Sequence, residues 1–478
     1  MKNQITGKEL LYLKIAKGLE QQISNEVLKV GDKLPSIRMI CRQHGVSMST
    51  AQFAYYELEG KSLIESRPQS GYYVSNSFKR KLAMPDTSRP DNKLYANAVT
   101  DIFDISSNKI NEKTFTLFSR GTPATPLLPI AKLNKGMQQA VRSLAGGGTV
   151  YEPLQGNEKL RTQVAKWSFN WKGNLSPKDI LTTNGCISAI SYCLMALTKR
   201  GDTIAVESPC FYGILQLAQS LGLKILELPA SPQTGIDIDA FKKIIQKTKL
   251  AVCIFVSNFN NPFGSLMPDE HKKLAVKLLE QYNVPLIEDD LYGDLYFGDR
   301  RPACCKSYDE SGLVLWCGSV SKTLAPAYRV GWVAPGKFME QLSKIKLFHS
   351  ICSTPLTHEV IGHFLENGRY DAHLRKLRRT LHTNYLQYVR VIGETFPEGT
   401  KLSRPQGGLS LWVELPKSID SIDLYNMALN YKISISPGSM FTLQKQFNNC
   451  MRLSYGLEWN AKTESSLKLL GKLAKESM

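Results

Sequence analysis

The stretch of sequence that decides the fold is SVSKTLAPAYRVGW, from Ser319 to Trp332. In it Lys322 follows two serines, Ser319 and Ser321, and Arg329 comes seven positions later. Hydroxyl and guanidinium groups bind phosphate oxygens, and a lysine amine forms a Schiff base with an aldehyde. The spacing predicts a loop in which phosphate ligands lie beside a reactive amine. A lysine between serines is more often an exposed surface residue, so the interpretation needs support elsewhere in the chain.

Apolar runs of strand length surround this loop and alternate with helical stretches. This alternation is typical of a mainly parallel sheet covered by helices on both faces, an α/β fold. At 478 residues the chain exceeds one ordinary core, which indicates two or three domains. The hydrophobic content of 42% excludes a disordered class, and the longest apolar runs are too short to span a membrane. The runs are 204–206, 251–256, 286–287 and 313–316.

Polar residues at the ends of other predicted strands could complete the site. The turn Gly185-Cys186-Ile187 follows one strand and opens a helix, a place where backbone amides bind phosphate. Asp289 and Asp290 lie in Ile287-Glu-Asp-Asp-Leu-Tyr292, directly after a buried strand. Clustered buried acids are unfavourable unless a cation pairs with one of them. The cysteines are scattered without metal-binding spacing, so we expect no metal site.

The first 75 residues have a different pattern. An apolar helical stripe runs from Leu10 to Ser24, a second helix is expected from Ser36 to Gly45, and a third is expected from Ser47 to Ile64. Two short helices joined at a glycine indicate a helix-turn-helix, and the residues after Leu63 indicate a hairpin wing. A three-helix packing module without nucleic acid is the alternative. The net charge of +18 favours a polyanionic partner, although residues 1–76 hold only ten Lys and Arg against seven Asp and Glu.

The sequence of this segment resembles that of a known DNA-binding module. LPSIRMICRQHGVSMSTAQFAYYELEGKSLIESRPQSGYYV, residues 34–74, is similar to the winged helix of GntR-family transcription regulators. Met48 stands where that family often has a basic residue, and Gln69 stands where a wing glycine is common, which bears on affinity and operator sequence. The resemblance implies that six residues contact DNA, and we call them the DNA-reading residues: Arg38, Ser47, Ser49, Thr50, Gln52 and Gly71.

Residues 115–475 resemble a second family. The lysine loop is similar to that of the fold-type I pyridoxal-phosphate proteins of aminotransferase class I/II, and further motifs follow in family order. The resemblance implies a Schiff base between Lys322 and pyridoxal 5'-phosphate, with Asp289 on the pyridinium. Asp290 is held in reserve for that role. The other implied contacts are to the phosphate (Ser319, Ser321, Arg329, Gly185, Cys186, Ile187), the ring hydroxyl (Asn261, Tyr292), the ring face (Phe211) and a ligand carboxylate (Arg452).

Tyr151 resembles the tyrosine that reaches the cofactor phosphate of the neighbouring subunit, which implies a homodimer. The fusion of the two parts resembles the MocR group of bacterial regulators, whose precedent suggests a head-to-tail dimer. We therefore predict a winged helix over 1–76, a linker over 77–114 and an aminotransferase-like domain with a small C-terminal lobe over 115–478.

The predicted function is a cytoplasmic, pyridoxal-phosphate-dependent transcription regulator. Its expected partners are operator DNA and an amino acid or amine effector, with no membrane. Two alternatives stay open. One is a working aminotransferase with an appended DNA-binding domain, and the other is a regulator that responds to pyridoxal phosphate alone.

Overall fold

The computed structural model describes the chain except for residues 1–10, 26, 62, 68–69, 76–81 and 97–113. Its largest unit is an eight-stranded sheet whose five central strands, β10 to β6, run parallel, while its edge pairs are antiparallel. The predicted α/β fold is confirmed. In sheet order the strands are β4 (Leu181–Thr183), β11 (Gly331–Ala334), β10 (Val314–Ser319), β9 (Leu286–Asp289), β8 (Val252–Phe255), β5 (Thr203–Ser208), β6 (Lys224–Ser231) and β7 (Gly235–Ile236).

Helices cover both faces of this sheet because its central strands carry buried apolar side chains on both faces. Ile204 and Val252 point to one face and their neighbours Ala205 and Cys253 point to the other, so two hydrophobic clusters form. The first cluster includes α7 (Cys186–Leu197), α8 (Tyr212–Ser220) and α11 (Met339–Ser350). The second includes α9 (Ile238–Lys247) and α10 (Asp269–Gln281).

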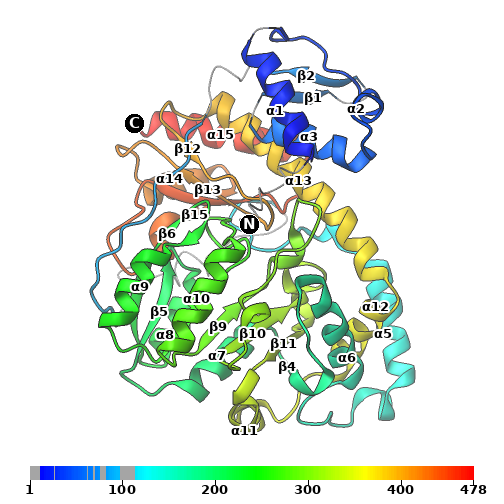
Figure 1. The fold of residues 1–478 in the computed structure, drawn as a ribbon, viewed down its shortest axis with the longest axis vertical. Helices are drawn as coiled ribbons and strands as arrows, with labels where there is room; N and C mark the ends of the chain where they lie inside the picture. Colours follow the sequence, from blue (N-terminus) through cyan, green and yellow to red (C-terminus); the bar gives the residue numbers. More distant parts are fainter. Residues whose placement is uncertain (1–10, 26, 62, 68–69, 76–81, 97–113) are drawn as a thin grey trace, which may run out of the picture.

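The C-terminal part forms the expected smaller lobe. A four-stranded sheet has the order β12 (Lys401–Leu402), β13 (Ser410–Glu414), β16 (Cys450–Ser454), β15 (Ser436–Pro437). Helices α14 (Ser421–Asn430) and α15 (Ala461–Glu476) belong to this lobe. A short parallel pair joins β3 (Thr116–Leu117) to β14 (Ile433–Ser434). The 27-residue helix α13 (Arg369–Thr395) runs between the lobes (Figure 1) and follows α5 (Ile130–Ser143), α6 (Glu158–Ser168) and α12 (Pro355–Glu366) in the chain.

The N-terminal part is a winged helix of α1 (Leu11–Ser24), α2 (Ile37–His44), α3 (Met48–Gly60), β1 (Ile64–Arg67) and β2 (Gly71–Val74). Local signals set its boundaries. Ser36 caps α2 by accepting a hydrogen bond from the Met39 amide, and Gly45 ends it with a φ of 62°. Ser47 caps α3 through the Thr50 amide. Helix α3 ends at Gly60 because the chain turns there into the wing.

The segment expected as a linker is extended where the structure describes it. Between residues 82 and 96 it is hydrogen-bonded to both lobes, since the Ala83 carbonyl accepts from the Leu402 amide of the small lobe and the Tyr95 carbonyl accepts from the Ile225 amide of the large sheet. The Ser88 hydroxyl donates to the Ser208 carbonyl at 2.6 Å. Gln69 of the wing and linker residues 77–81 and 97–113 lie outside the described residues.

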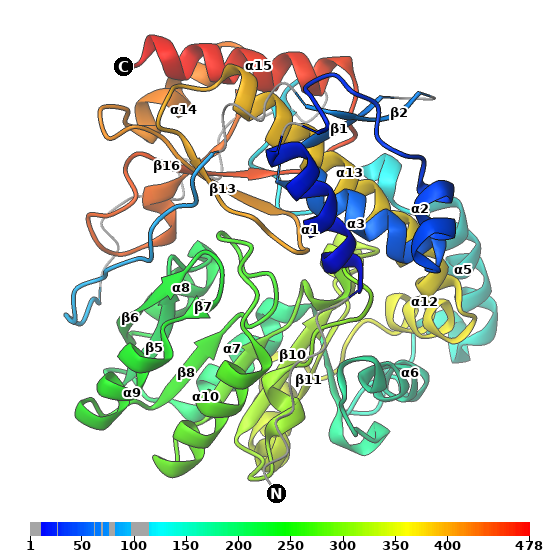
Figure 2. The ribbon, with the colours of Figure 1, turned by 45° about the horizontal axis from the view of Figure 1, so that its top comes forward.

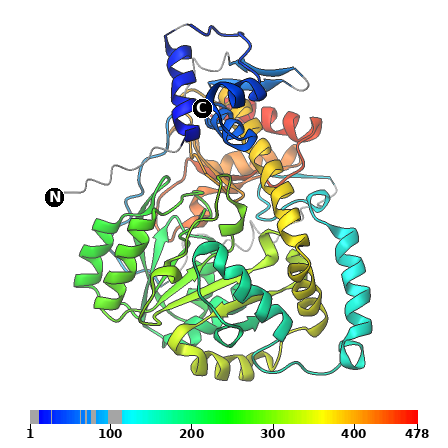
Figure 3. The ribbon, with the colours of Figure 1, turned by 45° about the vertical axis from the view of Figure 1, so that its right-hand side comes forward.

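The winged helix lies against α13, as the views in Figures 2 and 3 both show. No helix among the described residues is long and apolar enough to cross a membrane. Within the same residues, no group of three or more His, Cys, Asp or Glu side chains could hold a metal ion.

Candidate functional site: a cofactor cleft and a DNA-reading surface

Lys322 lies in a short helical turn directly after β10, at the carboxyl end of the sheet. Its Nζ atom donates a hydrogen bond to the Gly121 carbonyl at 2.8 Å. Desolvation, together with the charge of Arg452, lowers the pKa of Lys322 to about 8. A sizeable fraction of its amine is therefore neutral near physiological pH, the form that attacks an aldehyde.

The predicted phosphate ligands converge beside this lysine. Arg329 Nη1 donates to Ser321 Oγ at 3.2 Å, and the hydroxyls of Ser321 and Ser319 are 2.9 Å apart. Gly185 caps the N-terminus of α7 with a φ of 88°, and a Cβ there would lie 2.2 Å from Arg329 Nη2. Only glycine fits this turn. The result is an anion-binding cradle of hydroxyls, a guanidinium and the free amides that begin α7.

The two neighbouring acids occupy opposite environments. Burial raises the pKa of Asp290, but Arg301 outweighs this effect and holds it below its usual value. Arg301 Nη2 donates to Asp290 Oδ2 at 2.5 Å, and Asn258 Nδ2 and Trp316 Nε1 donate at 3.0 and 2.9 Å. Asp290 is therefore fully paired inside the protein.

Asp289 forms no ion pair among the described residues. It is 4% exposed, and it accepts a weak hydrogen bond from Cys186 Sγ at 3.6 Å and another from the Leu291 backbone amide. Burial raises its pKa to about 6, and the hydrogen bond from Cys186 and the charge of Lys322 oppose the shift only in part. A buried carboxylate of this kind is stabilised by a cationic group that enters the cleft.

Tyr292 and Asn261 lie next to Asp289. Tyr292 is buried, which raises the pKa of its hydroxyl, and this hydroxyl is hydrogen-bonded to Asn261. Lys322 Nζ lies 5.9 Å from the centre of the Tyr292 ring. Ser410 Oγ is 3.4 Å from Asn261 Oδ1 and connects this corner to the small lobe.

Arg452 enters the cleft from β16 of the small lobe. Its Nη2 atom donates to the Ser119 carbonyl and to Ser436 Oγ, while its buried Nε atom has no hydrogen-bond partner in the described structure. Burial lowers its pKa. A Cβ placed on Gly121 would lie 3.4 Å from Arg452 Nη1 and 3.6 Å from Lys322 Nζ. An arginine and a lysine from distant segments therefore converge on one glycine.

Sequence reasoning missed Gly121 and Tyr212. Gly121 has no motif signal, because its role is a close approach between segments 201 residues apart. Tyr212 follows the predicted Phe211, and its hydroxyl interacts electrostatically with Arg452 and Tyr292. The motif Ser208-Pro-Cys-Phe-Tyr-Gly213 contains both aromatic residues, but the prediction named only Phe211.

Phe211 and Tyr151 are the two remaining residues predicted for the cofactor site. Phe211 precedes α8, is half-buried, and its ring centre is 4.7 Å from that of Tyr212. Tyr151 is 75% exposed in the segment before α6, so it points outward from its own chain.

Three of the DNA-reading residues lie together at the start of α3, while Arg38 lies in α2 and Gly71 begins β2. Arg38, Ser47, Ser49 and Gly71 are exposed, and Thr50 and Gln52 are half-buried. Ser47 Oγ is 2.8 Å from the hydroxyls of both Ser49 and Thr50 at the start of α3. Exposed hydroxyls at a helix N-terminus suit phosphate and base edges.

Comparison with known proteins decides the family. Residues 115–461 match aminotransferase class I and II, and residues 11–74 match the gntR family of bacterial regulatory proteins. The chain belongs to the aminotransferase class I and II family. It carries a gntR-family helix-turn-helix domain in front, which is the MocR architecture.

Relatives share both parts of this MocR-type chain. It is 34% identical to the HTH-type transcriptional regulator YjiR of Escherichia coli, over 98% of this chain and 99% of the relative. It is 27% identical to the HTH-type transcriptional regulator NorG of Staphylococcus aureus, over 91% and 98%. A solved α-aminoadipate aminotransferase, LysN of Thermus thermophilus, complexed with N-(5'-phosphopyridoxyl)-L-leucine, superimposes with a TM-score of 0.72 at 25% identity, covering 76% and 93%. The predicted regulator architecture and its pyridoxal-phosphate fold are confirmed.

The residues of the cleft fit pyridoxal phosphate. The cradle at Gly185 suits the phosphate, the uncompensated Asp289 suits the pyridinium, and the neutral fraction of Lys322 suits the aldehyde. Arg452 keeps an unpaired buried Nε for an anionic ligand.

Proposed function

We propose that this MocR-type regulator binds pyridoxal phosphate on Lys322 and senses an amino acid or amine there, which alters its binding to operator DNA in the cytoplasm. The observation that carries the proposal is the convergence of Lys322 and Arg452 on Gly121, in a chain that also exposes its DNA-reading residues. A reactive amine beside a buried guanidinium selects ligands that have an amino group and a carboxylate.

The chain's own residues divide the work. Pyridoxal phosphate, when bound, supplies an aldehyde and an electron-accepting ring. Asp289 keeps a proton on the ring nitrogen, and Tyr292 and Asn261 hydrogen-bond the ring hydroxyl, while Phe211 packs on the ring. Ser319, Ser321, Arg329 and the α7 amides bind the phosphate, and Arg452 orients a carboxylate.

The protein acts as a head-to-tail homodimer in this proposal, and Tyr151 reaches the phosphate of the neighbouring subunit. The support is its exposure of 75%, together with exposed apolar residues such as Val150 and Phe348, which is 79% exposed.

A working aminotransferase is the second candidate. The observation that favours it is that the cleft lacks none of the groups the reaction needs: an amine with a pKa of about 8, a buried acid and a carboxylate-binding arginine. In that case the amine of Lys322 would carry protons during each catalytic cycle and would be regenerated at its end.

One experiment separates the two. The visible spectrum of the purified, pyridoxal-phosphate-loaded protein is followed with a panel of amino acids and amines, with a keto acid present. A persistent spectral change with one ligand and no accumulating product supports the sensor. Product that accumulates over many turnovers overturns it in favour of the enzyme. Lys322→Ala is the control, because it should abolish the yellow, borohydride-reducible adduct while the winged helix stays folded.

A further inference from the structure

Helix α13 contacts the loop of the reactive lysine. Near its start, Tyr370 Oη donates to Thr323 Oγ1 at 2.8 Å, and His373 Nε2 is 2.7 Å from the Thr323 carbonyl. Thr323 follows Lys322 directly. Tyr370 and His373 are both buried, so these bonds are made away from competing water. A shift of the lysine loop must therefore move or break contacts with α13.

The middle of the same helix holds the segment that carries Arg452. Asn384 Nδ2 donates to the carbonyls of Tyr455 and Leu457 at 3.0 and 2.6 Å, directly after β16. Tyr388 Oη donates to the Ser454 carbonyl at 2.9 Å. The lysine and the arginine that a ligand would join are thus both attached to one helix.

The winged helix docks on this helix through α3. The ring of Tyr56 packs edge-on against His382, with ring centres 4.4 Å apart and planes at 76°. His382 in turn stacks on Phe297 at 4.6 Å and 19°. We call Tyr56 and His382 the docking pair.

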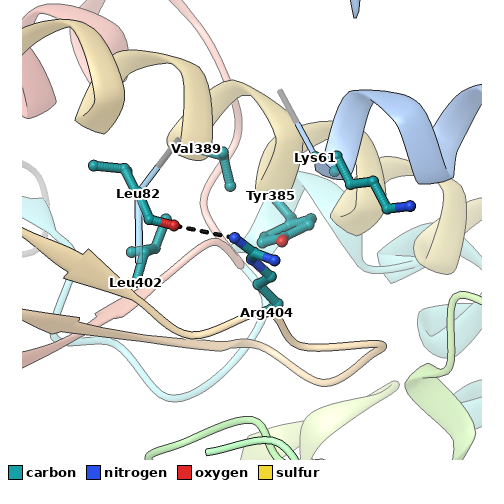
Figure 4. A pocket seen from close by; sticks show the side chains of 7 residues that line it. Lys61, Leu82, Tyr385, Val389, Leu402 and Arg404 are labelled. Atoms are coloured by element: carbon teal, nitrogen blue, oxygen red, sulfur yellow. Dashed lines mark hydrogen bonds between the residues drawn. The ribbon is translucent and has the colours of Figure 1, made fainter. Parts of the chain in front are cut away.

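A small pocket beside the docking pair shows how the surfaces meet (Figure 4). It is lined by the end of α3, by α13, by β12 and by Leu82 of the linker segment. Arg404 Nη2 donates to the Leu82 carbonyl at 3.0 Å across it. The remaining lining residues are Gly60, Lys61, Tyr385, Val389 and Leu402.

Tyr56 of the docking pair lies one helical turn after Gln52, which is one of the DNA-reading residues. Gln52 Nε2 donates to Tyr56 Oη at 2.6 Å on the same face of α3. The docked arrangement leaves Arg38, Ser47 and Ser49 exposed. The contact with α13 therefore sets the direction of α3 and does not cover its DNA-reading end.

The distances within α13 are short enough for rigid coupling. His373 and His382 are nine positions apart, which corresponds to about 13 Å along a helix axis. The helix between them is continuous and carries buried Leu374, Leu377 and Leu381. A packed helix moves as a body, because close-packed interiors transmit displacement.

We propose that α13 positions the Lys322 loop at one end and the recognition helix α3 at the docking pair, so that occupancy of the cofactor cleft changes how firmly and in which direction the winged helix is held. The inference rests on the proposed function and names the route of its regulation. A ligand shifts such an equilibrium only by contacts that differ between two states. The contacts at Thr323 and at the end of β16 are where cleft ligands act on α13.

Amide hydrogen exchange of residues 48–60 tests the proposal without knowledge of the operator. The full chain is compared with pyridoxal phosphate bound and with the cofactor stripped. In the wild type, loading should change exchange in α3 at least about fivefold, the lower end of ordinary coupling. Tyr56→Ala and His382→Ala should each abolish most of this change while the visible absorbance of the Lys322 adduct is retained.

Conservative variants separate positioning from a general loss of structure. Tyr56→Phe and His382→Phe keep the ring contact and should keep the response. Tyr431→Ala, which removes an exposed aromatic side chain from the small lobe, is the matched control and should behave as wild type. A response that persists in both alanine variants overturns the proposal, as does an α3 that does not respond in the wild type although the adduct forms. Absence of the adduct itself would instead refute the proposed function.

Discussion

Asp289→Asn should stabilise the cofactor-free protein, although it removes a residue assigned to the cofactor. In the folded chain burial raises the pKa of Asp289 to about 6, above its ordinary value of 3.8. The neutral Asp289 carboxyl therefore makes its full contribution to the free energy of unfolding below pH 3.8, and this contribution is lost as the pH rises through 6. At 1.36 kcal/mol for each pKa unit, the loss is about 3 kcal/mol at pH 7.5 and about half of that at pH 5. The asparagine variant does not pay this cost, since its amide stays neutral.

The assay is urea unfolding of the cofactor-free wild type and variant at both pH values. We expect the variant to be more stable by up to about 3 kcal/mol at pH 7.5, with a gain about half as large at pH 5. Pyridoxal phosphate should stabilise the wild type more than the variant, because only the carboxylate pairs with a pyridinium.

Asp290→Asn is the matched control and should have the opposite sign. It removes one of the two carboxylates that pair with Arg301, whose side chain is 4% exposed, and leaves Asp294 as the other. Breaking a buried ion pair on one side costs up to about 3–5 kcal/mol, and the remaining pair with Asp294 reduces this loss. Equal effects of the two substitutions, or a gain for Asp289→Asn that is the same at pH 5 and 7.5, would refute the assignment of the two acids.

Three further predictions concern the other parts of the molecule. Arg452→Ala should leave the adduct on Lys322 intact and weaken amino acids at least about tenfold, while amines without a carboxylate keep their affinity, as spectral titration would show; equal loss for both classes would contradict the role. Arg38→Ala should weaken duplex DNA binding and lower the slope of log K against log salt by about 1 in fluorescence anisotropy, with an unchanged cofactor spectrum. Burial lowers the pKa of His382 to about 4, so the stability its neutral ring contributes is present above pH 6.5 and lost as the pH falls toward 4. His382→Phe should therefore remove about 2 kcal/mol of the loss in unfolding free energy that the wild type shows between pH 7.5 and 5, and an unchanged loss would count against it.

Local signals made much of the fold predictable. Ser36 and Gly45 bound α2 in the structure as the sequence indicated, because a cap depends on hydrogen bonds within a few residues. The helix after Ser47 was expected to run on to Ile64 and instead ends at Gly60, where the wing begins. The site motifs around Lys322 and Gly185 could be predicted from the sequence because they too are local. Each is a short turn attached to the end of a strand.

The sequence alone determined that a reactive-lysine loop of a parallel α/β fold follows a helix-turn-helix, since each is recognised from a contiguous sequence motif. The resemblance named Asp289 for the pyridinium and kept Asp290 in reserve. Only the tertiary structure gave the two acids opposite environments, because that difference depends on the ion pair between Asp290 and Arg301. The close approach of Lys322 and Arg452 to Gly121, and the contact between Tyr56 and His382, exist only because distant segments pack together in the fold. Charge, burial and contact across the fold are properties of three-dimensional neighbours, and adjacency in sequence does not fix them.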